Sequence, residues 1–303
     1  SGNLVTNSTW NDFWLNEGFT VYFEHRIMEK LYGADYSEML ASLSLQDLKE
    51  EIKTMTEAGQ GEDTKLKLNL TDRNPDDGVT SIAYDKGYFF LRSIEEKYGR
   101  DKFDSFLKNY FSSHAFTSMD TDGFMKDIKN YYQSQYTIEL QDSLFNAWIF
   151  TAGLPAESPV PKSERFNKVD SLISAWSKTS KLDGAITKTW STHEWLHFLN
   201  NLPSPLSIQQ LEKLDAENHF TASGNSEILC VWLGLAVKNN YTKAYPKLEQ
   251  FLVNTGRRKF LTPLYTELIK TDAGKLRAKA IYQKARPNYH FVATNTMDKL
   301  LAN

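Results

Sequence analysis

The residues at positions 10–19 could bind a metal ion. They read WNDFWLNEGF. On a helix, Glu17 shares its face with Phe13 and Val21, so its carboxylate lies on a mostly apolar stripe. A carboxylate buried without a partner costs several kcal/mol or becomes protonated. The pattern therefore favours one of two roles for Glu17: an ion pair with a lysine or arginine elsewhere, or a ligand to a metal ion.

A second set of potential metal ligands lies in the other half of the chain. Residues 193–197 read HEWLH, an HExxH pattern in which two histidines hold zinc and the glutamate acts as general base. Glu217 follows near zinc-ligand spacing, but the Asn-Glu pair that usually marks such a ligand is absent there. We expect His193 and His197 to be partly buried helix residues, and we keep a peptidase that uses His193, Glu194 and His197 as an alternative.

The first stretch resembles a known family. Residues 2–7 (GNLVTN), Trp10 and residues 15–19 (LNEGF) resemble the segment after the HExxH helix of the aminopeptidase N family of zinc peptidases, family M1. The likeness is strongest to its branch resembling leukotriene A(4) hydrolase. The resemblance implies that Glu17 is the third zinc ligand. It also implies that the HExxH segment, with two zinc ligands and the general base, ends just before Ser1 and lies outside this chain.

A second motif supports the same family. Residues 83–87 read AYDKG and resemble the family's Tyr-Glu-Lys-Gly segment, whose tyrosine stabilises the oxyanion of the tetrahedral intermediate. The resemblance implies that role for Tyr84. Asp76 lies where that branch has an acidic residue facing the substrate pocket, although an aspartate in a turn is also an ordinary turn residue. Val79 replaces a tyrosine linked to epoxide chemistry, which favours peptide cleavage over lipid epoxide hydrolysis.

The third motif is basic. Residues 256–260 read GRRKF and resemble a Gly-Arg-x-Lys-Phe segment of the same branch, in which the arginine and lysine bind the substrate carboxylate. A guanidinium group suits a carboxylate because it can donate two parallel hydrogen bonds. Arg257 and Lys259 are therefore candidate substrate ligands. For Arg258 we expect only an interaction with the carbonyl groups of its own helix end.

Helices must position these residues. Apolar spacing predicts helices over residues 9–31, 103–111 and 124–132 in the first half. Leu66, Leu68 and Leu70 alternate with polar residues and predict a strand. The helices predicted after the middle of the chain cover residues 166–178, 187–201, 207–217, 226–238, 246–254, 261–271 and 272–285.

The chain is long enough for two domains. Three prolines within residues 155–161 forbid a continuing helix, so we predict domains at 1–153 and 164–303 with a proline-rich linker at 154–163. The predicted fold is mainly α. The resemblance implies that the first domain is the helical, C-terminal part of a thermolysin-like (gluzincin) catalytic domain. It implies that the second is an all-α helical-repeat domain of the ARM/HEAT type.

Composition excludes several classes of protein. The 303 residues carry 35 basic and 38 acidic side chains, a net charge of −3, which favours neither nucleic acid nor an anionic membrane. Cys230 is the single cysteine and cannot form an internal disulfide. No apolar run reaches the ~18 residues of a membrane span. We expect no nucleic-acid or membrane partner and a cytoplasmic location.

These observations lead to a functional prediction. The chain is expected to be the C-terminal portion of a zinc metalloaminopeptidase that hydrolyses N-terminal residues from short peptides. Its predicted partners are those peptides and the missing N-terminal portion of the same protein, and the isolated chain is predicted to be inactive. A non-catalytic helical scaffold or interaction module is a further alternative. Metal analysis separates these interpretations.

Overall fold

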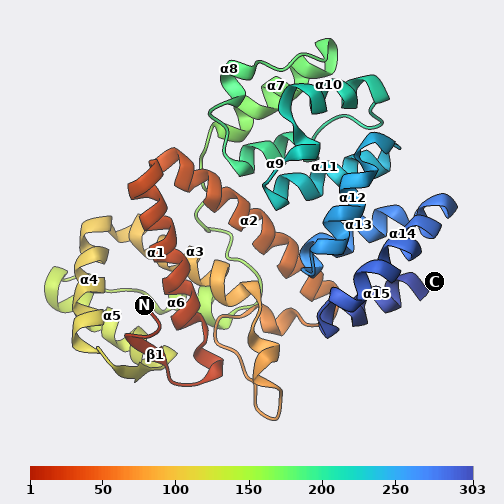
Figure 1. The fold of residues 1–303 in the computed structure, drawn as a ribbon. Coiled ribbons are helices and arrows are strands. Elements are labelled where there is room, and N and C mark those ends of the chain that lie inside the picture. Colours follow the sequence, from red (N-terminus) through yellow and green to blue (C-terminus); the bar gives the residue numbers. More distant parts are fainter. Residues whose placement is uncertain (303) are drawn as a thin grey trace. The chain divides into compact units, whose positions relative to one another are not determined.

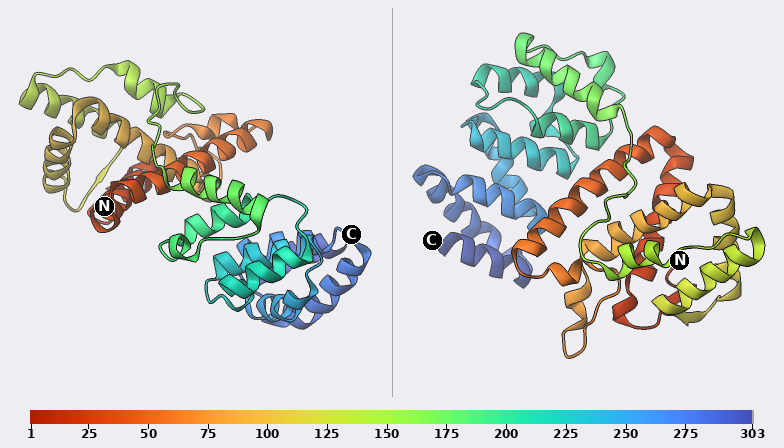
Figure 2. Two further views of the ribbon diagram at one scale, coloured as in Figure 1. Left: turned by 90° about the horizontal axis from the view of Figure 1, so that it is seen from above. Right: turned by 180° about the vertical axis from the view of Figure 1, so that it is seen from behind.

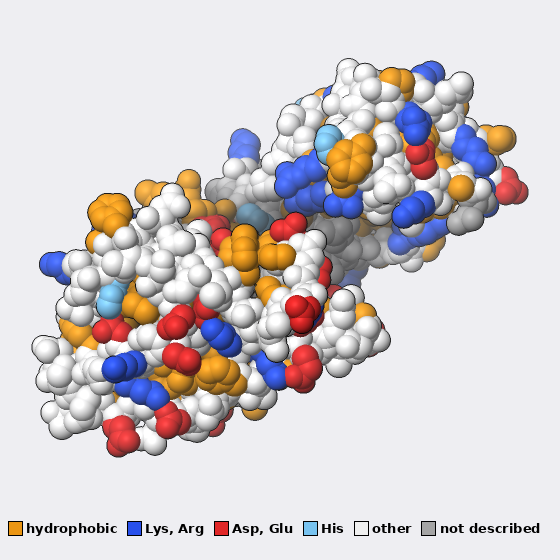
Figure 3. Space-filling model, turned by 90° about the horizontal axis from the view of Figure 1, so that it is seen from below, with side chains coloured by type: hydrophobic (Ala, Val, Ile, Leu, Met, Phe, Trp, Pro, Cys, Tyr) orange, Lys and Arg blue, Asp and Glu red, His pale blue; other side chains and the backbone are white. Residues whose placement is uncertain are grey.

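The computed structural model describes residues 1–302, and the chain forms two compact units, Ser1–Arg165 and Phe166–Asn303 (Figure 1). Figure 2 shows the helices of each unit from two further directions. The prediction of a mainly α fold is confirmed. No helix within residues 1–302 is long and apolar enough to cross a membrane. The face drawn in Figure 3 carries both basic and acidic side chains.

The first unit combines helices with one small parallel sheet. Strand β1 pairs with β2 in register from Val5 opposite Thr117 to Asn7 opposite Met119. In chain order the elements are β1 (Val5–Asn7), η1 (Trp10–Asp12), α1 (Trp14–Tyr32), α2 (Ala34–Glu57), η2 (Gly61–Thr64), η3 (Pro75–Gly78), η4 (Ile82–Lys86), α3 (Gly87–Tyr98), α4 (Arg100–Ser113), β2 (Thr117–Met119), α5 (Thr121–Tyr136), α6 (Asp142–Phe145) and η5 (Asn146–Phe150). Both η4 and η5 are π-helical turns, and η1, η2 and η3 are 3-10 turns.

Helix α1 is central to the first unit, where it packs against α2, α3 and η4. Its buried Phe19 stacks on Tyr110 of α4 with ring centroids 5.7 Å apart. Phe19 also meets Phe124 of α5 edge-on at 5.8 Å. The aromatic faces predicted at residues 103–111 and 124–132 therefore lie on α4 and α5 and pack against α1. Gly33, with φ of 90°, ends the helix.

The predicted strand at Leu66, Leu68 and Leu70 is wrong. Leu66 and Leu70 are buried as the alternation requires, but no strand pairs with this segment in the part of the chain that the structure describes. Its amide groups instead bind isolated acceptors: Leu66 donates to the Ile149 carbonyl at 3.1 Å, and Leu70 donates to the Asn11 side chain at 2.9 Å. Alternating apolar and polar residues indicate an extended chain with one buried side. Such a chain becomes part of a sheet only if a neighbouring strand pairs with it.

The second unit contains helices and turns but no strand within residues 166–302. Helices α9, α11, α13 and α15 each contact the next member of that series, and α12 contacts α14. The elements are α7 (Arg165–Thr179), α8 (Gly184–Thr187), α9 (Thr192–Asn200), α10 (Ile208–Asn218), η6 (Phe220–Ala222), α11 (Ser226–Lys238), η7 (Thr242–Ala244), α12 (Tyr245–Asn254), α13 (Arg258–Leu268), α14 (Asp272–Ala285), η8 (Arg286–Asn288) and α15 (Phe291–Ala302).

Most of the predicted helices of the second half are present, with one exception. The helix predicted over residues 187–201 begins only at Thr192, as α9, and α8 ends at Thr187. Ser191 caps α9 with a capping box: its hydroxyl accepts from the Glu194 amide, and the Glu194 carboxylate accepts from the Ser191 amide. Residues 151–164 contain neither helix nor strand. That stretch is tied to the first unit, since the Lys162 amide donates to Glu38 at 2.8 Å and the Ser163 hydroxyl donates to Asp35 at 3.0 Å. The exact domain limits and the helical-repeat assignment stay predictions.

Candidate functional site

Glu17 lies in the first turn of α1 and is half-buried. No residue within 1–302 forms an ion pair or hydrogen bond with its carboxylate, so the ion-pair alternative finds no partner in the described chain. Burial raises the pKa of Glu17 above its ordinary value. The helix N-terminus favours a negative charge at this place. The result is a carboxylate that is partly desolvated and available to a ligand.

Tyr84 occupies the π-helical turn η4 and is also half-buried. Its ring meets Phe13 edge-on, with centroids 5.9 Å apart. Burial raises the pKa of Tyr84, and the negative charge of Glu17 raises it further. Its hydroxyl has no hydrogen-bond partner among residues 1–302. The structure therefore brings Glu17 and Tyr84, which are far apart in the sequence, within electrostatic range of each other.

The glycines that follow both residues explain this proximity. A Cβ atom on Gly18 would lie 2.8 Å from the Gly87 Cα, and a Cβ on Gly87 would lie 2.8 Å from the Gly18 Cα. Ordinary carbon contacts are about 3.5–4.0 Å. Helix α1 and the start of α3 can approach this closely only because neither residue has a side chain. The last residues of the Asn-Glu-Gly and Tyr-Asp-Lys-Gly motifs are thus in contact.

Asp76 differs from Glu17 and Tyr84 in its surroundings. It is exposed in the turn η3, where its backbone amide donates to the Asn74 side chain at 3.1 Å. Its own carboxylate has no partner within the described residues. Val79, one residue after the turn, is 45% exposed. The structure shows an accessible carboxylate at Asp76, and its role in substrate binding stays a prediction.

The predicted carboxylate ligands of the second unit differ from each other. Arg257 is exposed directly before α13, and its guanidinium group has no ion-pair partner within residues 1–302. Lys259 is exposed too, but its Nζ lies 2.6 Å from Oε1 of Glu227. Arg257 is therefore available to bind an anion. Lys259 can bind one only if its ion pair with Glu227 breaks or is shared with the anion.

The HExxH pattern at residues 193–197 lies on α9, and both histidines are half-buried, as predicted. His197 Nε2 lies 2.7 Å from Oδ1 of Asp170, and its ring stacks on Phe166. His193 Nδ1 is buried and has no hydrogen-bond partner among residues 1–302, and burial lowers the pKa of His193. Glu194 caps its own helix. Within residues 1–302 no three His, Cys, Asp or Glu side chains are grouped to hold a metal ion.

Comparison with known proteins agrees with the motifs around Glu17 and Tyr84. Residues 1–148 match the peptidase family M1 domain, and residues 190–301 match the C-terminal domain of leukotriene A4 hydrolase. The chain belongs to peptidase family M1. It is 31% identical to leucine aminopeptidase 2 of Chaetomium globosum over 99% of this chain and 50% of that protein. It is 30% identical to leucine aminopeptidase 2-1 of Meyerozyma guilliermondii, over 96% and 49% of the two chains.

Solved structures give the same result. The chain is similar to native leukotriene A4 hydrolase of Saccharomyces cerevisiae, with a TM-score of 0.88 and 26% identity over 100% of this chain and 52% of that one. A complex of the yeast enzyme with bestatin is also similar, with a TM-score of 0.84. The M1 chain described here spans about half the length of the curated relatives that it matches.

Two titratable residues beside Tyr84 were not singled out from the M1 motif. Burial raises the pKa of Asp85 to about 6, with the charges of Asp47 and Glu24 adding to the shift and a hydrogen bond with Ser44 opposing it. Lys86 is fully buried. Its burial lowers the pKa to about 7. The sequence shows both residues, but nothing in it indicates that they lie inside the unit.

Hydrogen bonds from distant segments fix the start of α1. Asp12 is 0% exposed and accepts from the amide and hydroxyl of Thr121 at 2.9 and 2.7 Å, from Thr9 at 2.6 Å and from Lys67. Burial would raise the pKa of Asp12, but these hydrogen bonds lower it below its ordinary value. Asp12 therefore holds the turn η1, from which α1 and Glu17 continue.

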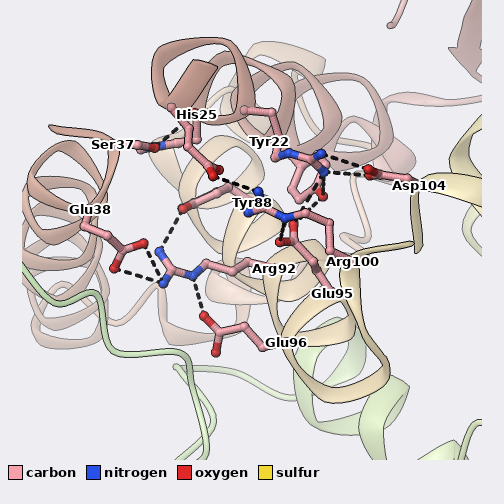
Figure 4. Close-up of polar contacts among 12 residues, drawn as sticks. Tyr22, His25, Ser37, Glu38, Tyr88, Arg92, Glu95, Glu96, Arg100 and Asp104 are labelled. Atoms are coloured by element: carbon pink, nitrogen blue, oxygen red, sulfur yellow. Dashed lines mark hydrogen bonds and ion pairs between the residues drawn. The ribbon is translucent and has the colours of Figure 1, made fainter. Parts of the chain in front are cut away.

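A polar network fixes the other end of α1 (Figure 4). Arg26 donates to the Tyr22 hydroxyl at 2.7 Å, and that hydroxyl donates to Glu95 of α3. Arg92 of α3 binds Glu38 of α2 at 2.9 Å. Partly buried charge-assisted bonds of this kind are stronger than surface ion pairs. The network holds α1, α2 and α3 together, and so it holds the two helices that position Glu17 and Tyr84.

Proposed function

We propose that the complete protein is a zinc aminopeptidase that removes N-terminal residues from short peptides. In this proposal the present chain supplies one zinc ligand, Glu17, and one oxyanion donor, Tyr84. The observation that carries it is the half-buried carboxylate of Glu17, which has no partner within residues 1–302 and whose charge acts on the Tyr84 hydroxyl. Membership of family M1 and the leucine aminopeptidases among the relatives support the same activity.

Glu17 fits a zinc site as one ligand of several. A catalytic zinc ion takes about three protein ligands, and residues 1–302 contain no such group. Further ligands must come from elsewhere, so the isolated chain is expected to hold no stoichiometric zinc and to be inactive. When bound, zinc would polarise the scissile carbonyl and activate a water molecule.

Tyr84 is suited to donate a hydrogen bond to the oxyanion. Its raised pKa keeps the hydroxyl protonated at neutral pH, and no described residue competes for its proton. The edge-on contact with Phe13 limits how far the ring can turn. A positioned donor stabilises the charge that develops on the substrate oxygen only in the transition state.

Substrate binding is assigned by the family resemblance together with local geometry. Arg257, exposed and unpaired within the described chain, would bind the carboxylate of a short peptide, and Lys259 would assist after exchanging Glu227. Asp76, with its accessible carboxylate, is a candidate contact for a substrate group that is positively charged or donates hydrogen bonds. Arg258 is left out of this assignment.

The metal ligand is tested by zinc content in the complete protein. Glu17→Gln keeps the size of the side chain but removes its charge, so bound zinc should fall well below one equivalent. His193→Ala is the control and should retain zinc, because no group of three potential metal ligands within residues 1–302 includes His193. Zinc retained by Glu17→Gln, or lost from His193→Ala, would overturn the assignment. Wild-type protein without zinc would support the scaffold alternative.

The oxyanion donor is tested by steady-state kinetics on a short peptide. Tyr84→Phe should lower kcat by about 10²–10³-fold with little change in KM, the loss typical of one oxyanion donor. Tyr32→Phe is the control, since Tyr32 is 60% exposed on α1 and should leave kcat unchanged. An unchanged kcat in Tyr84→Phe would remove Tyr84 from the mechanism.

A further inference from the structure

The amino group of Lys86 lies in the interior of the first unit with no acidic partner among the described residues. Its side chain is 0% exposed, and no carboxylate within residues 1–302 forms an ion pair with it. The charge that acts on it is the like-signed Lys65, which adds to the effect of burial in lowering the pKa to about 7. A lysine in this state loses its hydration. Its place must therefore be supported by other contacts.

Those contacts are two main-chain carbonyl groups. Lys86 Nζ donates to the carbonyl oxygen of Thr64 at 2.7 Å and to that of Thr151 at 2.9 Å. Thr64 ends η2, and Thr151 directly follows η5. The hydroxyl of Thr64 also accepts from the Gly153 amide at 2.8 Å. The ammonium group thus joins the end of η4 to two segments, at Thr64 and at Thr151, neither of which continues as a helix.

The joined segments continue to the start of α1. The chain leaving Thr64 donates two hydrogen bonds to Asn11 of η1, from the Leu68 amide to its carbonyl at 3.2 Å and from the Leu70 amide to its side chain at 2.9 Å. Tyr84 precedes Lys86 by two residues in the same π-helical turn. The ammonium group therefore fixes the turn that carries Tyr84 to the chain that surrounds the start of the Glu17 helix.

We propose that Lys86 is a positioning residue for Tyr84: its bonds to the Thr64 and Thr151 carbonyls hold the η4 turn so that the Tyr84 hydroxyl keeps its place beside Glu17. This inference rests on the proposed function, in which Tyr84 donates to the oxyanion. Lys86 touches no substrate itself. A misplacement of about 1 Å can cost about 10²-fold in rate, so loss of this anchor should reduce turnover while substrate binding persists.

A double-mutant cycle in the complete protein tests the proposal. Lys86→Met keeps an unbranched chain of similar length but removes the donors, and it also removes the cost of burying a charge, which helps the fold to persist. We expect kcat to fall by about tenfold or more with KM within about twofold. In the Tyr84→Phe background the same substitution should lower kcat by less than about twofold, because the hydroxyl that Lys86 positions is already absent.

Controls separate positioning from folding. Lys65→Met alters a neighbouring, partly exposed lysine paired with Glu62 and should leave kcat unchanged. Circular dichroism reports whether each variant folds, and Lys86→Gln, which keeps an amide donor, replaces Lys86→Met if the latter is unfolded. Where both variants fold, Lys86→Gln should retain a higher kcat than Lys86→Met.

The outcomes distinguish the two proposals. An unchanged kcat in folded Lys86→Met, or an equal loss in both backgrounds, would overturn the positioning role. An unchanged kcat in Tyr84→Phe alone would overturn the proposed function and the positioning role with it. A loss in Lys86→Met that disappears in the Tyr84→Phe background would support both.

Discussion

The contact between Gly18 and Gly87 leaves no space for a side chain, and Gly18→Ala tests whether that contact positions the site. The new Cβ would lie 2.8 Å from the Gly87 Cα and 3.0 Å from its carbonyl carbon. Both neighbours are main-chain atoms, which cannot turn away as a flexible side chain could. Helix α1 must therefore move from α3 by a substantial part of 1 Å, given the usual carbon separation of about 3.5–4.0 Å.

The magnitude follows from two opposing effects. Alanine is favoured over glycine inside a helix by about 1 kcal/mol, whereas an extra methyl group in a closely packed contact costs about 1–3 kcal/mol. Gly234→Ala is the matched control. Gly234 lies inside α11, and a Cβ there would meet only Leu264, at 4.0 Å. Gly18→Ala should thus be about 1–3 kcal/mol less stable than Gly234→Ala.

The assay compares both variants of the complete protein by urea unfolding and by peptide hydrolysis. Gly234→Ala should be slightly stabilised and fully active. Gly18→Ala should unfold at a lower urea concentration, and its kcat should fall because Glu17 and Tyr84 move apart. Equal stability of the two variants would show that the helices can separate without cost. Full activity of a destabilised Gly18→Ala would show that the contact does not position the site.

Two further predictions concern charged side chains. Because the pKa of folded Lys86 is about 7, below its ordinary value of 10.5, the folded state binds fewer protons than the unfolded state between these values. The free energy of unfolding of the wild type, relative to that of Lys86→Met, should therefore rise by about 2 kcal/mol from pH 7 to pH 9. Thermal unfolding of both proteins at the two pH values measures this difference. A difference that does not change with pH would show that Lys86 stays charged. Arg257→Ala should raise KM about tenfold for peptides with a free carboxylate but not for their C-terminal amides, and Lys259→Ala should do so less, because Glu227 already binds Lys259. Equal effects on acids and amides would exclude carboxylate recognition by these residues.

Local patterns allowed most helices to be predicted. A helix that buries one face needs apolar residues every three or four positions. Residues 103–111 and 124–132 have this spacing, and they form parts of α4 and α5. The mainly α fold and the family could also be predicted, since the motifs around Glu17 and Tyr84 are short continuous stretches. The break between α8 and α9 had a local signal as well, in the Ser191 and Glu194 capping box.

Other features depended on partners far along the chain. The alternation of Leu66, Leu68 and Leu70 resembled a strand, but whether a strand forms depends on a neighbouring strand, and here the acceptors are Asn11 and Ile149. Lys86 looked like an ordinary lysine of the motif. Its burial depends on the Thr64 and Thr151 carbonyl groups, which belong to segments far from Lys86 in the sequence.

The sequence alone determined which chemical groups the chain offers: the carboxylate of Glu17, the hydroxyl of Tyr84, and the helices that carry them, because residue type and local spacing are written in the chain. Tertiary structure decided that Glu17 has no partner among the described residues, that its charge reaches Tyr84, and that Gly18 meets Gly87. These are distances between segments that are remote in sequence. Packing of the whole unit sets such distances, and no local pattern encodes them.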